Sequence, residues 1–274
     1  ALYSISQEFR KLQIAEIYFF FANTSQYYGS FNIAIEYYQQ ELQISKEKLG
    51  PKHARVATSY NNLGSICWKT GDLEKAKEYH QLAMEIQKEQ LGPNHVDVAT
   101  SYNNLGTVYN DTGDLEKAKE YYQLALEIRK EQLGPNHVYV ATCYNNLGSM
   151  CRKTGDLEKA KEYHQLGMQI QKEQLCPNHV NIATSYNNLG TVYYDTGDLE
   201  KAKEYYQLAL EIRKEQLGPN HFVVATSYNN LGSMCWKTGD LEKAKEYHQL
   251  AMEIQKEQLG PNHVDVATSY NNLG

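Results

Sequence analysis

Residues 56–97 read VATSYNNLGSICWKTGDLEKAKEYHQLAMEIQKEQLGPNHVD, and residues 98–139 read VATSYNNLGTVYNDTGDLEKAKEYYQLALEIRKEQLGPNHVY. The Leu-Gly-Pro-Asn-His segment, or a close variant of it, returns every 42 residues along the chain. Its prolines are all the prolines of the sequence: Pro51, Pro93, Pro135, Pro177, Pro219 and Pro261. Because proline interrupts helices, its confinement to one connector per unit leaves two long stretches of each unit free to be helical.

Both stretches carry apolar residues at helical spacing. In the unit 56–97, the first predicted helix has an apolar face that comprises Val56, Tyr60, Leu63, Gly64 and Cys67. The second predicted helix has a face that comprises Leu73, Ala76, Tyr79, His80, Ala83, Ile86 and Gln90. Each unit is therefore predicted to be a pair of antiparallel helices.

The predicted helix ends follow from residues with known positional preferences. Gly71 breaks the first helix, and Asp72 is a typical N-cap for the second. The second helix is expected to end at Leu91 and Gly92, because glycine suits a left-handed position and Pro93 cannot continue the helix. Cys176 replaces this glycine in one unit, so we expect a strained or rearranged connector there.

A single hairpin cannot bury both of its apolar faces, so neighbouring hairpins must stack. The sequence thus predicts an all-α fold, an α-solenoid that winds as a right-handed superhelix. Cys67 with His80, and their counterparts, alternate with pairs such as Tyr109 with Tyr122, which gives a second period of 84 residues. The predicted organisation is 1–13, the end of a preceding helix; 14–55, a divergent hairpin; 56–97, 98–139, 140–181, 182–223 and 224–265, regular hairpins; and 266–274, a truncated first helix.

These residues resemble the tetratricopeptide repeat family. Consensus positions of that repeat are occupied in this chain by Tyr60, Leu63, Gly64, Cys67, Ala76, His80 and Ala83. The lengthened unit, with Leu-Gly-Pro-Asn-His and Val-Ala-Thr-Ser-Tyr-Asn-Asn-Leu-Gly, is similar to the repeats of kinesin light chain. The resemblance covers roughly residues 14–274. It implies that the first helices line a concave face, and that asparagines on this face hold the backbone of a peptide.

The first helices carry an asparagine pair in every regular unit, and each carboxamide offers both a donor and an acceptor. Two other positions of these helices vary from unit to unit: Arg55, Asp97, Tyr139, Asn181 and Val223 at one, and Trp68 and its counterparts at the other. We expect the asparagines to hold a peptide backbone and the variable residues to set specificity. The predicted peptide-binding residues are Asn61, Asn62, Trp68, Lys69, Asn103, Asn104, Asn110, Asn145, Asn146, Arg152, Asn187, Asn188, Tyr194, Asn229, Asn230 and Trp236.

Two alternatives stay open at these positions. The asparagine pairs either bind a ligand or only solvate a face and bond neighbouring repeats, and the variable residues either set specificity or have drifted at exposed positions. The predicted function is a scaffold that binds a protein or an extended peptide on the concave face. The alternatives are a structural array that associates with its own copies, and the sensor arm of a larger signalling protein, of which this chain would be one piece.

Other function classes find little support in the sequence. A net charge of −6 gives no positive electrostatic potential that would attract phosphates, so nucleic acid is not expected as a partner. The longest apolar run, residues 17–22, is too short to span a bilayer. Five cysteines without a Cys-x-x-Cys pattern indicate reduced thiols in a cytoplasmic protein and no structural zinc. No catalysis is expected, because Cys67 and His80 occupy positions that pack inside the hairpin. No metal or other cofactor is expected either, because connector histidines such as His95 occur once per unit and cannot converge on a metal within one unit.

Overall fold

The computed structural model describes residues 2–259, and every regular element in that range is an α-helix. The chain divides into two compact units, Ala1–Pro135 and Asn136–Gly274, and each is described by itself. The helices of the first unit are α1 (Leu2–Tyr27), α2 (Phe31–Leu49), α3 (Ala54–Lys69), α4 (Leu73–Leu91), α5 (Val96–Thr112) and α6 (Leu115–Leu133). The helices of the second unit are α7 (Val138–Lys153), α8 (Leu157–Gln174), α9 (Val180–Thr196), α10 (Leu199–Leu217), α11 (Phe222–Thr238) and α12 (Leu241–Leu259).

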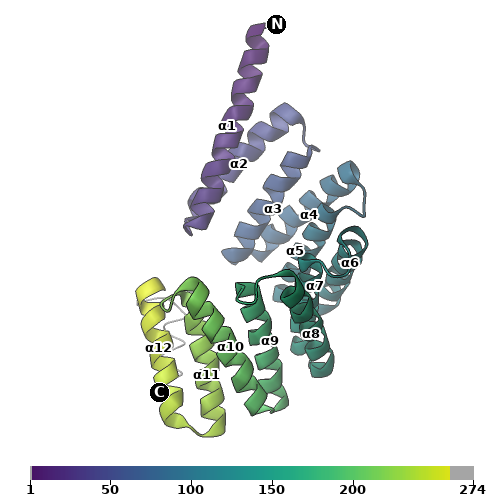
Figure 1. Ribbon diagram of the computed structural model, residues 1–274. Coiled ribbons are helices and arrows are strands. Elements are labelled where there is room, and N and C mark those ends of the chain that lie inside the picture. Colours follow the sequence, from purple (N-terminus) through teal and green to yellow (C-terminus); the bar gives the residue numbers. More distant parts are fainter. Residues whose placement is uncertain (1, 260–274) are drawn as a thin grey trace. The chain divides into compact units, whose positions relative to one another are not determined.

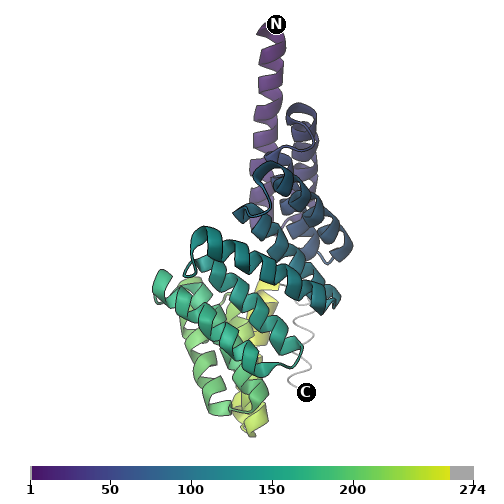
Figure 2. The ribbon, with the colours of Figure 1, turned by 90° about the vertical axis from the view of Figure 1, so that its right-hand side faces the viewer.

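Consecutive helices form antiparallel hairpins in both units (Figure 1). Hairpins of one unit stack through the second helix of one and the first helix of the next, as α4 does on α5 and α10 on α11. Figure 2 shows this sequence of paired helices in the second unit, coloured from teal to yellow. The predicted all-α array of tandem hairpins is confirmed, whereas its right-handed superhelix stays a prediction.

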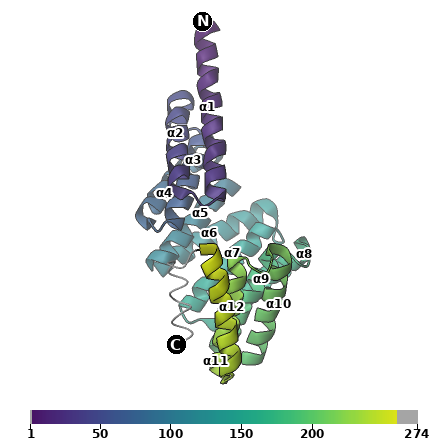
Figure 3. The same cartoon turned by 90° about the vertical axis from the view of Figure 1, so that its left-hand side faces the viewer.

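The first helix of the first hairpin begins earlier in the chain than the predicted boundary at residue 14. Helix α1 runs without a break from Leu2 to Tyr27, so residue 14 is not the start of a helix and residues 2–13 extend α1 itself. Figure 3 shows α1 projecting beyond its partner α2. At the other end of the chain, the predicted truncated helix 266–274 lies outside the described residues.

Helix starts follow two rules in the regular hairpins, from α3 onward. Their second helices begin after an aspartate, and the Asp72 carboxylate accepts a hydrogen bond from the Lys75 backbone N–H (3.2 Å), as the sequence predicts. The first helices begin after the connector histidine, whose Nδ1 accepts from the backbone N–H two residues later, 3.1 Å away for His95 and Asp97. The connector histidine is therefore itself the N-cap of the first helix.

The connector after the second helix needs glycine in its regular form. Gly92 has φ +86° and ψ 158°, a conformation that residues with a Cβ rarely adopt. No residue other than glycine has positive φ in the described part of the chain, so Cys176 does not take up this conformation. Instead α8 ends one residue early, and Leu175 becomes its C-cap with φ −119°. The prediction of a rearranged connector at Cys176 is confirmed.

The cores of the hairpin junctions are mostly apolar and contain a few buried polar side chains. Val56, Leu63 and Ile66 of α3 are fully buried in one cluster with Tyr38 and Leu42 of α2. The predicted second-helix face is wrong at its end, because Gln90 is exposed. Gln87, three residues earlier, is buried instead (7% exposed), since its amide has a hydrogen-bond partner in the next hairpin.

A glycine in each regular first helix lets the two helices of a hairpin approach closely. A Cβ built on Gly64 would lie 2.8 Å from the imidazole ring of His80, and one built on Gly190 would lie 2.8 Å from the ring of Tyr206. The buried ring has no free space into which it can turn, because His80 is 2% exposed and hydrogen-bonded. This close approach explains the Leu-Gly pair of the repeat.

We predict opposite effects for two Gly→Ala substitutions inside helices. Gly64→Ala should lower the free energy of unfolding by about 1–3 kcal/mol, because the new methyl group collides with His80. Gly167→Ala should raise it by about 1 kcal/mol through helix propensity, since the counterpart position holds a buried alanine in other hairpins, such as Ala83 and Ala209. Urea denaturation followed by circular dichroism measures both, and equal effects of the two substitutions would contradict the packing described.

Candidate functional site

The first asparagine of the pair in α3 lies inside a hairpin junction. The Asn61 Oδ1 is 2.9 Å from His80 Nδ1 in its own hairpin, and Asn61 Nδ2 donates to Ser101 Oγ (2.9 Å) in α5. Ser101 in turn donates to Gln87 Oε1 (2.6 Å) of α4. Two helices of one hairpin and the first helix of the next are thereby joined by a buried polar network.

The same network recurs in the second unit, where it joins α7, α8 and α9. Asn145 Nδ2 donates to Ser185 Oγ (3.0 Å), and Asn145 Oδ1 faces His164 Nδ1 at 3.1 Å. Ser185 donates to Gln171 Oε1 (2.7 Å). The Asn145 carboxamide thus contacts a histidine of its own hairpin and a serine of the next, and these contacts link the two repeats.

The junction between α10 and α11 is built differently, because arginine stands where Gln171 stands one unit earlier. Arg213 donates to Ser227 Oγ (2.7 Å) and to Asn187 Oδ1 (3.4 Å). Asn230, the second asparagine of its pair, donates to the same Asn187 Oδ1 at 2.8 Å. Burial lowers the pKa of Arg213 to about 10, so the guanidinium is still charged at neutral pH. The alternation of glutamine and arginine along the second helices thus produces two kinds of junction.

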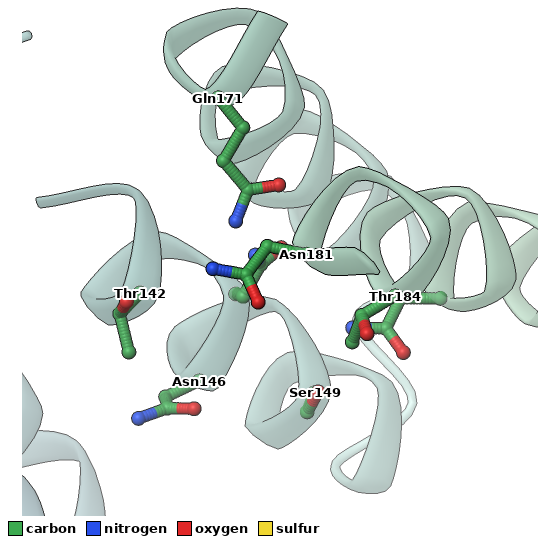
Figure 4. Close-up of a pocket in the computed structure, with 8 residues that line it drawn as sticks. Thr142, Asn146, Ser149, Gln171, Asn181 and Thr184 are labelled. Atoms are coloured by element: carbon green, nitrogen blue, oxygen red, sulfur yellow. The ribbon is translucent and has the colours of Figure 1, made fainter. Parts of the chain in front are cut away.

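The second asparagine of α9, Asn188, lies outside the network of Asn145, Gln171 and Ser185. Asn188 in α9 is half-buried and lines a cavity of about 210 Å³ between the first helices α7 and α9. Figure 4 shows Thr142, Asn146 and Ser149 along α7, with the amide of Gln171 directed from α8 toward Asn181 of α9. Asn145 and Thr184 complete the lining. All the lining side chains are neutral amides or hydroxyls, so this groove offers many donors and acceptors and no formal charge.

The variable positions near the ends of the first helices make contacts between hairpins. Trp68 Nε1 donates to Asp111 Oδ2 (2.7 Å) of the next first helix. Arg152 forms an ion pair with Asp195 (3.0 Å). The Lys237 ammonium lies 4.1 Å from the centroid of the Tyr194 ring and donates to the backbone oxygen of that residue.

The predicted site residues therefore fall into groups with different surroundings. Those with hydrogen bonds inside the hairpin stack are Asn61, Asn145, Asn187, Asn229 and Asn230, of which Asn229 pairs with His248. Those that line the groove of α7 and α9 are Asn145, Asn146 and Asn188. Half-buried on their first helices lie Asn62, Asn103, Asn104 and Asn110, while Lys69 is exposed near the Phe31 ring and Trp236 is 63% exposed.

Sequence reasoning missed Gln171, which reaches this groove from a second helix. The signal was present in the sequence, because one phase of the second helix holds Gln87, Arg129, Gln171, Arg213 and Gln255 in turn. An alternation of glutamine and arginine within an otherwise apolar face marks a buried polar partner.

The cysteine and the histidine of the hairpin are both buried, and they have different neighbours. His80 packs on Gly64 and is held by Asn61, whereas Cys67 clusters with Ala76 and Val108. Burial raises the pKa of the Cys67 thiol and lowers the pKa of His80 to about 4. A neutral imidazole and a protonated thiol are the forms that the core stabilises at neutral pH. Among the described residues, no cluster of three or more histidine, cysteine or acidic side chains is arranged to hold a metal ion.

The family model of the tetratricopeptide repeat matches residues 13–89, 55–131, 97–173, 147–215, 181–257 and 223–274. The chain belongs to the tetratricopeptide repeat family. No curated protein sequence matches it. Within the described range, none of the helices of these repeats combines the length and the apolar character needed to cross a membrane.

Solved structures of other proteins resemble this array of tetratricopeptide repeats. BtubC (BKLC) from P. vanneervenii is 25% identical with a TM-score of 0.65, over 85% of this chain and 91% of that one. A putative kinesin light chain of Podosopora anserina with nearly identical TPR-like repeats is 21% identical with a TM-score of 0.60, over 75% and 97%. The apo form of RapI is 19% identical with a TM-score of 0.69, over 90% and 84%. The last two likenesses concern the fold alone.

We predict that two asparagines of neighbouring first helices respond differently to alanine. Asn145→Ala should destabilise the protein by about 1–3 kcal/mol, because buried groups of His164 and Ser185 lose their partner. Asn188→Ala is the matched control and should change stability by less than about 0.5 kcal/mol. Equilibrium denaturation in urea measures both, and a large loss for Asn188→Ala would show that this side chain also belongs to the stack.

Stability should also fall in mild acid because of the buried histidines. Burial lowers the pKa of His80 and of His164 to about 4 and shifts that of His248 in the same direction. A histidine of the unfolded chain takes up its proton near pH 6.5, so the stabilisation is complete above that pH and is lost as the pH falls toward 4. The expected loss at pH 4 is about 3 kcal/mol each for His80 and His164.

The matched control for this pH dependence copies the tyrosine hairpins, in which Tyr206 donates to Thr191. The variant carries Ser65→Thr, His80→Tyr, Ser149→Thr and His164→Tyr, and its stability should change less between pH 6.5 and 4. Thermal melts across this range measure the difference. Parallel curves for the two proteins would assign the acid sensitivity to other groups.

Proposed function

We propose that this chain is a protein-binding scaffold, and that the first-helix groove of α7 and α9 holds an extended peptide. The observation that carries the proposal is the cavity of about 210 Å³ lined by Asn146, Asn181 and Asn188 together with neighbouring hydroxyl groups. A carboxamide both donates and accepts, as the backbone of an extended peptide does, so these side chains match a main chain in either direction. Binding of proteins is also the general role of the tetratricopeptide family, to which the chain belongs.

The neutral lining favours recognition of backbone and uncharged side chains in this part of the groove. On the same two first helices, Arg152 and Asp195 are paired with each other at 3.0 Å. A charged peptide residue at the cavity would lose water without gaining an opposite charge. The peptide segment that lies over Asn181 and Asn188 is accordingly expected to be polar but uncharged.

The variable first-helix residues have a smaller role here than the sequence hypothesis gave them. Contacts with the next hairpin already occupy the polar or aromatic groups of Trp68, Arg152 and Tyr194. Trp236 is more exposed than Trp68 (63% against 37%) and is the best candidate for a side-chain anchor. All five cysteines are free thiols, four of them buried, which supports a reducing compartment such as the cytoplasm.

The proposal is tested with a random peptide display library selected on the wild-type protein. For the enriched peptides, Asn181→Ala with Asn188→Ala should weaken binding by about tenfold or more, since each lost hydrogen bond contributes roughly 0.5–1.5 kcal/mol. Asn220→Ala, in an exposed connector, is the matched control and should bind normally. Isothermal titration gives the affinities, and equal affinity of the groove variant and the control would refute the proposed groove.

A further inference from the structure

Each tyrosine hairpin fills the space beside its first helix with an aromatic ring held between two lysines. In α9, the Tyr193 ring stacks on Tyr205 of α10 with centroids 5.4 Å apart and planes inclined by 7°. Lys161 Nζ of α8 lies 5.6 Å from the centroid of Tyr193, and Lys201 Nζ of α10 lies 5.2 Å from it. These distances are typical of cation–π contacts.

The first unit repeats this arrangement around Tyr109 of α5. Its ring stacks on Tyr121 at 5.4 Å and 12°, with Lys77 Nζ at 5.7 Å and Lys117 Nζ at 5.2 Å from its centroid. Two lysines and a stacked tyrosine therefore form a cage for a phenol ring wherever the repeat supplies one.

One unit after Tyr193, the cage is present and its ring is missing. Cys235 of α11 stands at the position of Tyr193, while Lys203, Lys243 and Tyr247 stand at the positions of Lys161, Lys201 and Tyr205. These four residues line a cavity of about 230 Å³ among α10, α11 and α12. We call it the Cys235 cavity.

The Cys235 cavity has the size and the walls that an aromatic ring requires. A cavity of about 150 Å³ is sufficient for a benzene molecule. Its floor is apolar, since Leu231, Met234 and Cys235 are at most 5% exposed, whereas the lysines at its rim are exposed. Burial raises the pKa of the Cys235 thiol, which keeps this part of the floor uncharged.

The cysteine hairpin of the first unit lacks this cage. There Cys67 has Lys75 and Tyr79 beside it, but Ile35 stands at the position of Lys203 and packs into the core of its junction. A cysteine at this position is therefore not sufficient, because the Cys67 hairpin has only one of the two lysines that stand beside Cys235.

We propose that the Cys235 cavity binds a phenol ring from outside the chain, in the place that Tyr193 occupies in the preceding hairpin. The ring belongs either to a tyrosine side chain of a bound protein or to a free small phenol. It would stack on Tyr247 and lie between the ammonium groups of Lys203 and Lys243. This site shares no residue with the groove of α7 and α9, so it stands or falls independently of the proposed peptide groove.

The test is a titration of the whole chain with p-cresol, which is the tyrosine side chain itself, followed by nuclear magnetic resonance and by the melting temperature. Wild-type protein should bind p-cresol saturably and at least about tenfold more tightly than cyclohexanol, which has similar size but no π face. Equal binding of the two compounds, or no binding of p-cresol, would overturn the proposal without the need for any variant.

Two variants locate the site. Cys235→Tyr should fill the cavity from within, raise the melting temperature and weaken p-cresol binding by at least about tenfold. Tyr193→Cys should create a second p-cresol site, which keeps the location testable if Cys235→Tyr fails to fold. Unchanged p-cresol binding in Cys235→Tyr, or a single site in Tyr193→Cys, would place the ligand elsewhere and contradict the proposal.

Titration with a second ligand, the peptide Gly-Tyr-Gly, distinguishes a tyrosine side chain of a bound protein from a free small phenol as the source of the ring. Binding of this peptide comparable to p-cresol, and lost in Cys235→Tyr, assigns the cavity to tyrosines of partner proteins. Binding of p-cresol alone assigns it to small phenols.

Discussion

The stacking of one hairpin on the next is the constraint from which the other features of each unit follow. A two-helix hairpin buries one face between its own helices and needs a neighbour to bury the rest. In the first unit, α3 presents Val56, Leu63 and Ile66 to α2, and all three are inaccessible to water. Removal of a neighbour would expose this surface.

Each stack also carries a polar network at the centre of an apolar junction. The carboxamide of Asn61 or Asn145 serves a histidine in its own hairpin and a serine in the next, so the hairpins must meet in one register for every group to be paired. Buried polar groups without partners are costly, which makes such a network a device for specificity more than for stability. It also explains why only some asparagines of the helices are left for a ligand.

Two features alternate with the period of 84 residues: the junction between hairpins contains glutamine or arginine, and the space beside the first helix is filled by a tyrosine or left open beside a cysteine. Where the second helix holds Gln171, the second asparagine of the next hairpin stays at the groove, and where it holds Arg213, Asn230 is drawn into the stack. Where the first helix holds Tyr193 the lysine cage is filled, and where it holds Cys235 the cage is open. Nearly identical repeats thus differ in the side chains and cavities that they expose.

The hairpins were predictable from the sequence because their determinants are local. Apolar spacing, the cap of Asp72 and the glycine and proline connectors act within a few residues, and even the altered connector at Cys176 follows from the loss of one glycine. The site was only half predictable. A repeated asparagine marks a position of importance, but its partner lies about 40 residues away in the next hairpin, and the sequence does not say whether that partner is a serine or a ligand. For the same reason the buried residue Gln87 was missed and Gln90 was wrongly assigned to the core.

A double-mutant cycle between Gln171 and Ser185 tests most directly whether polar groups link the hairpins. The two side chains come from α8 and α9 and meet at 2.7 Å. Free energies of unfolding of Gln171→Ala, Ser185→Ala and the double variant should give a coupling energy of about 1 kcal/mol or more, as expected for residues in one buried network. A coupling energy within about 0.3 kcal/mol of zero would contradict the account, because additive effects mean that the two hairpins do not depend on this contact.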